Sequence, residues 1–234
     1  MRREHESRES HEGQDRERHE QERHEQGDDG LRDGRGDEGW REDSGDDGLR
    51  GRLVRVGVEL VNAEGAQALS LREIARRAGV SHGAPRRHFP THLDLLSAIA
   101  RQGFAELAAR VAAEDREGAG PRERIALLAR VYLDYAGSRR GMYELMFRHD
   151  LLESGRLGLR ETSLPLFARL TELVARVRPG ADPVVVSGAL WANLHGIAQL
   201  WHWGSLRLAT GGDDPAPLLA AALDAHLGPV EPTP

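Results

Sequence analysis

Residues 70–89 read SLREIARRAGVSHGAPRRHF, and this stretch decides the fold. Ser70 is followed three residues later by a glutamate, a pair that caps a helix because each side chain can bond the other's backbone amide. The pattern predicts a short helix over residues 71–78 and, with Ser81 as its N-cap, a second over residues 82–88. The Ala-Gly-Val-Ser between them allows a tight turn, because glycine tolerates a left-handed backbone. Two short helices joined in this way form a helix-turn-helix, whose second helix enters the major groove of DNA.

Arginine is concentrated on these two helices. Over residues 71–89, five arginines and one glutamate give a net charge of +4, whereas the whole chain carries −6 because residues 1–50 are strongly acidic. All 32 basic residues are arginines, so their total says little about nucleic acid, and a solvated charged face is the competing interpretation. Their concentration beside a helix that fits the groove is what neutralisation of DNA phosphates requires, and it favours DNA binding.

The rest of the chain beyond residue 48 shows helical periodicity and no convincing strand alternation. Thr91 and Asp94 cap a long helix that starts at residue 92, and Asp182 with Pro183 starts another. The predicted helices cover residues 49–64, 71–78, 82–88, 92–113, 122–137, 142–147, 157–177, 183–204 and 215–227. We therefore expect an all-α fold of about nine helices.

Residues 1–48 form an acidic low-complexity segment with almost no large apolar side chain, so we expect it to be disordered. A misassigned start codon would give the same appearance. A metal site is disfavoured, because no two of its histidines at positions 5, 11, 19 and 24 are three or four residues apart. The chain has no cysteine, no apolar run of membrane-spanning length and no secretory signal, so we expect a cytoplasmic protein.

Residues 52–96 resemble the N-terminal domain of the TetR family of transcriptional regulators, through LSLREIARRAGVS, Gly-Ala-Pro, His-Phe-Pro and Asp-Leu-Leu. Three positions depart from the family pattern: Arg86 replaces a tyrosine, His92 replaces a lysine, and Val56-Gly57 replaces paired alanines. The resemblance implies a three-helix helix-turn-helix domain followed by a C-terminal helical ligand-binding and dimerisation domain. The expected divisions are a disordered tail at 1–48, the DNA-binding domain at 49–97, the C-terminal domain at 98–228 and a disordered tail at 229–234.

Position within the motif assigns the DNA contacts. His82, Gly83 and Ala84 begin the recognition helix and are expected to face base edges, while Arg87 reaches a guanine or a phosphate. Phosphate contacts are expected from other positions of the motif, including Arg86. The full predicted DNA-binding set is Ser70, Ser81, His82, Gly83, Ala84, Arg86, Arg87, His88 and His92.

The C-terminal half carries a second resemblance. Trp191, His195 and Gly196 resemble the Trp-His-Gly signature of one class of TetR C-terminal domains, and residues 142–147 are similar to its companion segment. This resemblance implies a small-molecule pocket in each subunit and a homodimer built from the last two helices. The predicted ligand-binding residues are Tyr143, Phe147, Trp191, His195 and Gln199. For His195, the alternative is a hydrogen-bonded core residue with no ligand contact.

These patterns together predict a repressor that an effector, partly hydrophobic in character, releases from a palindromic operator in double-stranded DNA. Neither a cofactor nor a metal is expected, and no membrane partner. Two alternatives stay open. A sequence-independent architectural protein would bind any duplex equally. An enzyme is disfavoured, because the sequence contains no thiol nucleophile, no HExxH motif and no glycine-rich phosphate loop.

Overall fold

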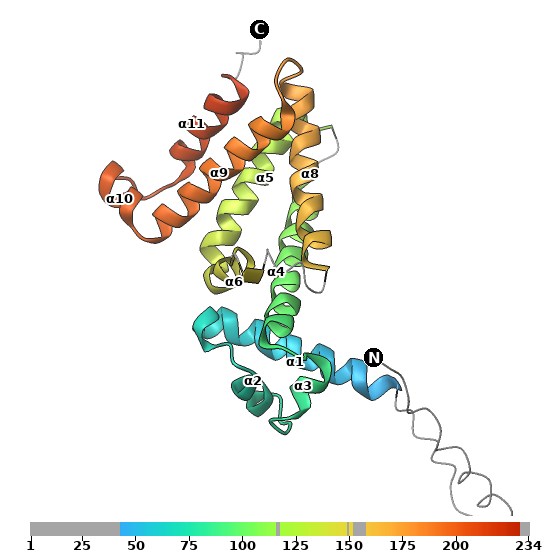
Figure 1. Cartoon of the computed structure of the whole chain (residues 1–234). Helices are drawn as coiled ribbons and strands as arrows, with labels where there is room; N and C mark the ends of the chain where they lie inside the picture. The colour runs from blue at the N-terminus through green and yellow to red at the C-terminus, as the bar shows by residue number, and fades with distance from the viewer. Residues whose placement is uncertain (1–42, 116–117, 149, 152–157, 230–234) are drawn as a thin grey trace, which may run out of the picture. The chain divides into compact units, whose positions relative to one another are not determined.

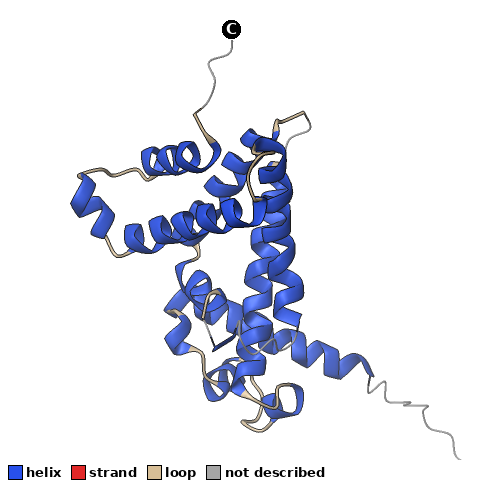
Figure 2. Ribbon diagram, turned by 45° about the horizontal axis from the view of Figure 1, so that its top comes forward, coloured by secondary structure: helices blue, strands red, loops and turns tan. Residues whose placement is uncertain are grey.

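The computed structural model describes residues 43–115, 118–148, 150–151 and 158–229, and every regular element among them is helical (Figures 1 and 2). The all-α prediction is confirmed. The ten α-helices of this part of the chain, against about nine expected, are α1 Asp43–Glu64, α2 Leu71–Arg77, α3 Ala84–His88, α4 His92–Glu114, α5 Pro121–Ser138, α6 Arg140–Met146, α8 Leu159–Val177, α9 Pro183–His202, α10 Ser205–Thr210 and α11 Ala216–Leu227, with a short 3-10 turn, η1, at Ala66–Ala68.

Helix α1 begins at Asp43, six residues before the predicted start at Leu49. Residues 43–48, which the sequence assigned to a disordered segment, are therefore helical. Residues 1–42, with the four histidines of that segment, and residues 230–234 lie outside the described part of the chain.

Helices α2 and α3 form the predicted helix-turn-helix. Ser70 caps α2 as expected, because its Oγ accepts a hydrogen bond from the Glu73 amide at 3.2 Å. Gly79 turns the chain with a φ of 67°, which a side chain would resist. The prediction that Ser81 caps the second helix is wrong, because α3 begins at Ala84 with Gly83 as its N-cap. Pro85 explains the shift, since proline fits the first turn of a helix, where its missing amide is not needed.

Helix α4 connects the helix-turn-helix to the rest of the molecule. Thr91 and Asp94 form a complete capping box at its start, as predicted. Its first turns bury Leu95 and Ile99 in the core of the three N-terminal helices, while Phe104 belongs to its C-terminal half. At about 1.5 Å per residue, its 23 residues make a rod of about 34 Å.

Helices α5 and α8 pack beside α4, α9 packs on α5 and α8, and α11 lies against α9 and α5 (Figure 1). The prediction of one helix over residues 183–204 is nearly correct, but α10 was not predicted. Gly204, with a φ of 79°, ends the preceding segment and starts this extra turn of helix. Pro165 does not break α8, which runs through it. Among the described residues, no helix combines the length and the apolar character needed to cross a bilayer.

Helix α6 is packed tightly against both α1 and α4. A Cβ at Gly141 would overlap the carbonyl oxygen of Val61 and lie 3.0 Å from the Cα of Gly65, both in or next to the end of α1. A Cβ at Gly103 on α4 would lie 2.6 Å from the Sδ of Met146. Helix α6 therefore joins the C-terminal helices to the helix-turn-helix through a close backbone approach at Gly141 and through methionine side chains at Gly103.

Candidate nucleic-acid interface and cavity

Helix α3 presents two arginines to solvent. Arg86 and Arg87 are both exposed, and neither has an ion-pair partner among the described residues. Arg72 on α2 is exposed in the same way. An exposed guanidinium with no internal partner retains all of its donors for an external anion. The face of α2 and α3 therefore has positive charge available for phosphate groups.

The two other arginines of the motif are already paired. Glu73 accepts hydrogen bonds from Arg76 Nη2 at 2.6 Å and from Arg77 Nε at 2.7 Å, and Arg77 also pairs with Glu64. These bonds from Arg76 and Arg77 lower the pKa of Glu73 to about 2. Glu73 therefore holds these two arginines on the side of α2, and it does not serve mainly as the reciprocal cap that the sequence suggested.

The remaining predicted DNA contacts divide into two groups. Ser81, His82 and Gly83 are exposed just before α3, while Ala84 and His88 are half-buried within it. Ser70 and His92 instead stand at the starts of α2 and α4.

His92 has one of its ring nitrogens committed inside the fold. Its Nε2 lies 3.0 Å from the carbonyl oxygen of Leu69, and only a protonated nitrogen can donate to that oxygen. In the neutral ring the remaining nitrogen is then an acceptor, so His92 is poorly suited to bind phosphate unless the ring is charged.

Helix α3 is anchored from beneath by its apolar residues. Pro85 is buried, and Phe89 at the end of the helix is fully buried. The guanidinium of Arg50 lies over the Phe89 ring, 5.2 Å from its centroid. These contacts fix the orientation of a helix of only five residues, which could not be stable alone.

A cavity of about 480 Å³ lies between α4, α5, α8 and α9. Five aromatic side chains contribute to its wall, and Trp191 is central among them because its ring lies 6.0 Å from Phe147 and 6.3 Å from Phe167. Leu164 and Trp191 are 59% and 39% exposed, which places the opening of the cavity beside them. The lining consists of Phe104, Leu107, Val111, Ile125, Leu128, Ala129, Tyr132, Phe147, Ser163, Leu164, Leu166, Phe167, Leu170, Gly188, Trp191, Ala192 and Leu194.

A polar cluster of Tyr132, Tyr143 and His195 adjoins this wall. The Nδ1 of His195 lies 2.9 Å from the Tyr132 hydroxyl and 2.7 Å from the Tyr143 hydroxyl, and the two hydroxyls are 3.0 Å apart. Burial lowers the pKa of His195, so its ring is neutral near pH 7. Burial also raises the pKa of Tyr132 to about 12, despite hydrogen bonding with Tyr143 and Trp191 that acts the other way. The cluster therefore carries no charge.

The predicted ligand-binding residues are only partly brought together. Phe147 and Trp191 line the cavity, whereas Tyr143 and His195 lie behind it in the polar cluster. Gln199, two turns further along α9 than Trp191, is not part of the lining. Sequence reasoning missed Tyr132, whose place on the apolar stripe of α5 gave it no sign of a polar role, and Phe167 on α8.

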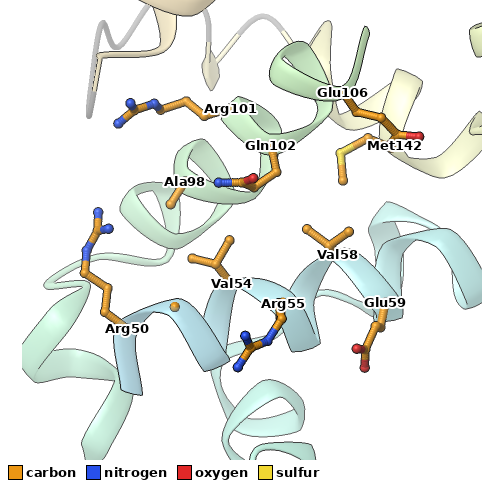
Figure 3. Close-up of a pocket in the computed structure, with 11 residues that line it drawn as sticks. Arg50, Val54, Arg55, Val58, Glu59, Ala98, Arg101, Gln102, Glu106 and Met142 are labelled. Atoms are coloured by element: carbon orange, nitrogen blue, oxygen red, sulfur yellow. The ribbon is translucent and has the colours of Figure 1, made fainter. Parts of the chain in front are cut away.

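A second cavity, a groove of about 490 Å³, lies between α1 and α4. Val54 and Val58 form its floor on α1, and Figure 3 shows Arg50 and Arg101 at one end and Met142 at the other. Its rim is charged, in contrast to the cavity between α4, α5, α8 and α9.

Comparison with known families gives two matches. Residues 53–99 match the model described as bacterial regulatory proteins of the tetR family, and residues 125–226 match the model described as the tetracyclin repressor-like C-terminal domain. A comparison with curated protein sequences gives no match.

Solved structures with a similar fold include regulatory proteins of the TetR family. The chain is similar to a protein of unknown function from Rhodococcus sp. RHA1, with 28% identity and a TM-score of 0.65 over 82% of this chain and 97% of that one. It is also similar to a TetR-family member from Streptomyces coelicolor A3, with 28% identity and a TM-score of 0.54 over 78% and 99%. A third similar structure is the multidrug binding protein EbrR complexed with imidazole, with 29% identity and a TM-score of 0.50 over 79% and 97%.

Proposed function

Because the chain belongs to the TetR family of bacterial regulatory proteins and is a DNA-binding transcriptional regulator, we propose that it is a repressor which a small-molecule effector releases from its operator. It is a cytoplasmic homodimer that binds a palindromic DNA site. The observation that carries this proposal is the pair of exposed arginines on α3, which have no ion-pair partner in the described part of the chain and lie where a recognition helix meets the duplex.

The two ends of α3 make different contacts with DNA. At its N-terminal end, Gly83 and Ala84 have little or no side chain and allow the backbone to come close to base edges, beside the exposed His82. Arg86 and Arg87 then bind phosphates or a guanine on either side of the groove. Arg76 contributes less, because Glu73 already neutralises it.

A homodimer is supported by an exposed stripe on α9. Val185, Ala189 and Leu200 recur at helical spacing and all are exposed, with Val185 at 65%. Helix α11 lies beside α9 and exposes Ala221 and Ala225, small residues that permit close helix packing. Two copies joined through these helices would present two recognition helices to the same face of DNA, about 34 Å apart as one helical turn requires.

Effector control is supported by the position of α4. This helix carries Leu95 and Ile99 in the core of the helix-turn-helix and Phe104 and Leu107 in the wall of the cavity. The cavity and the helix-turn-helix share α4. A ligand that binds more tightly to one position of α4 therefore shifts the equilibrium between the positions of the two recognition helices in the dimer. EbrR is described as a multidrug binding protein, and we extend small-molecule binding to this chain.

The test is selection of binding sites from a library of random DNA duplexes by the full-length protein at physiological salt. We expect enrichment of a palindrome whose half-sites are one helical turn apart. Equal recovery of all sequences would contradict the proposal and would indicate a sequence-independent DNA-binding protein.

A further inference from the structure

The described residues that line the cavity between α4, α5, α8 and α9 carry no formal charge. Every lining side chain is apolar except for the hydroxyls of Ser163 and Tyr132 and the indole of Trp191. The described lining contains no charged side chain, although 30% of the residues in the chain are charged. Charged groups of the neighbourhood, such as Arg169 and Asp115, pair with each other outside the lining.

An ion would enter this cavity at a large cost. Moving a charged group from water into an apolar site is strongly unfavourable unless an opposite charge or several hydrogen bonds compensate for the lost hydration. Ser163 offers little compensation, since its hydroxyl is turned to the carbonyl oxygen of Arg160 at 3.5 Å. The lining therefore selects against both anions and cations.

One polar group of a ligand can nevertheless be satisfied, at Tyr132. With the imidazole proton of His195 on Nε2, the Tyr143 hydroxyl can donate to Nδ1 and the Tyr132 hydroxyl can donate to the Tyr143 oxygen. The Tyr132 oxygen then keeps a lone pair for a ligand donor, even with the Trp191 indole bonded to it. With that proton on Nδ1, one hydroxyl hydrogen is left over for a ligand acceptor. The cluster can thus serve a donor or an acceptor without becoming charged.

On the basis of the proposed effector control, we propose that the effector is an uncharged, mainly apolar molecule held through a single hydrogen-bonding group by the Tyr132 hydroxyl. Tyr143 and His195 act as positioning residues, because they orient that hydroxyl from behind the wall. The apolar part of the effector packs between the aromatic rings of Phe147, Phe167 and Trp191.

Two fluorescent probes with the same ring skeleton test whether the cavity prefers an uncharged ligand. N-phenyl-1-naphthylamine is neutral and has one N–H donor, whereas 8-anilino-1-naphthalenesulfonate adds a sulfonate charge to the same rings. Titrated into the full-length protein without DNA, the neutral probe is expected to bind at least about tenfold more tightly. Equal or tighter binding of the sulfonate would overturn the proposal.

Matched variants assign the probe to the cavity. Gly188 lines the cavity and a Cβ there meets no atom within 4 Å, so Gly188→Leu places its side chain in the cavity with room for its first carbon. We expect Gly188→Leu to weaken the neutral probe about tenfold or more. Gly137 is equally open but lies on the exposed side of α5, so Gly137→Leu should leave binding unchanged. An unchanged affinity in Gly188→Leu would place the probe elsewhere and overturn the assignment.

Tyr132→Phe tests the hydrogen bond. It keeps the ring and removes only the hydroxyl, so the neutral probe should bind severalfold more weakly, and circular dichroism should show the same helix content. Unchanged affinity would overturn the role of Tyr132.

Adding the neutral probe to the complex with selected DNA separates this proposal from the proposed function. If the probe binds the cavity but leaves DNA bound, effector control fails while the ligand class stands. If the sulfonate binds more tightly and releases DNA, the ligand class fails while effector control stands.

Discussion

Two regions of the molecule differ in charge. The face of α2 and α3 exposes positive charge, whereas the cavity between α4, α5, α8 and α9 is lined by uncharged side chains. On the DNA-binding face, Arg86 and Arg87 are exposed and have no internal partner among the described residues. Among the described residues that line the cavity, Tyr132 is the one ionisable group, and burial keeps that phenol neutral by raising its pKa to about 12. The two regions belong to one compact unit and are joined by α4 and α6.

The difference shows that the position of an arginine matters more than the number of arginines. The chain has 32 basic residues, yet Glu73 and Glu64 pair with Arg76 and Arg77, close to the three arginines of the motif that remain available. An exposed charge acts through salt-sensitive attraction to phosphate, while the cavity acts by excluding ions. A given substitution is therefore expected to have different consequences in the two regions.

The largest expected effect is at the junction between the two regions. Gly141→Ala places a methyl group against the carbonyl oxygen of Val61, and backbone atoms cannot rotate away as side chains can. We expect the free energy of unfolding to fall by about 2 kcal/mol, in a single cooperative transition measured by chemical denaturation.

Gly137→Ala is the matched control for that variant. Gly137 also lies in a helix but has no atom within 4 Å of a Cβ, so alanine should stabilise the protein by about 0.5–1 kcal/mol. Two separate transitions in Gly141→Ala would show that the charged and uncharged regions fold independently, contrary to the close packing of α6 on α1.

The next largest effect concerns the charged region alone. Arg86→Ala should lower the affinity for the selected operator about tenfold and reduce the slope of log affinity against log salt by about one. Both quantities are measured by fluorescence anisotropy at several salt concentrations. Arg76→Ala is the control, and it should change affinity by less than about twofold, because Glu73 already pairs with that residue. Equal losses in the two variants would refute the distinction between paired and available arginines.

The helix-turn-helix was predictable because its signals are local. The cap at Ser70, the positive φ at Gly79 and the capping box of Thr91 and Asp94 each depend on residues within a few positions. The error at Ser81 is local too: a serine is a common N-cap, but the position of Pro85 in the first turn decided where α3 begins.

The cavity was less predictable, because it depends on residues far apart in the chain. His195 was identified as a candidate, but its hydrogen bond to Tyr132 spans 63 positions. Helix periodicity places Tyr132, Phe147 and Phe167 on apolar faces without saying which of them meet. Only the packing of α5, α8 and α9 distinguishes the wall, with Phe147 and Trp191, from the layer behind it, with His195.

The smallest expected effect is a pH dependence that comes from the uncharged region. Burial lowers the pKa of His195 below the 6.5 of an ordinary histidine, so the unfolded chain binds more protons than the folded one as the pH drops below that value. The stability that depends on neutral His195 is therefore complete above about pH 6.5 and is lost as the pH falls. We expect Tm to decrease between neutral and mildly acidic buffer, and to decrease less in His195→Asn, whose amide can still bond the two tyrosines.

His202 must be separated from this effect, because burial, followed by the charge of Arg140, lowers its pKa as well. His202→Gln is the control for that contribution, and the double variant should lose most of the acid sensitivity. A full decrease of Tm in His195→Asn would mean that the folded protein accepts a proton at His195 without cost. The layer behind the cavity would then tolerate charge, and the contrast with the arginine-bearing face would be confined to the lining itself.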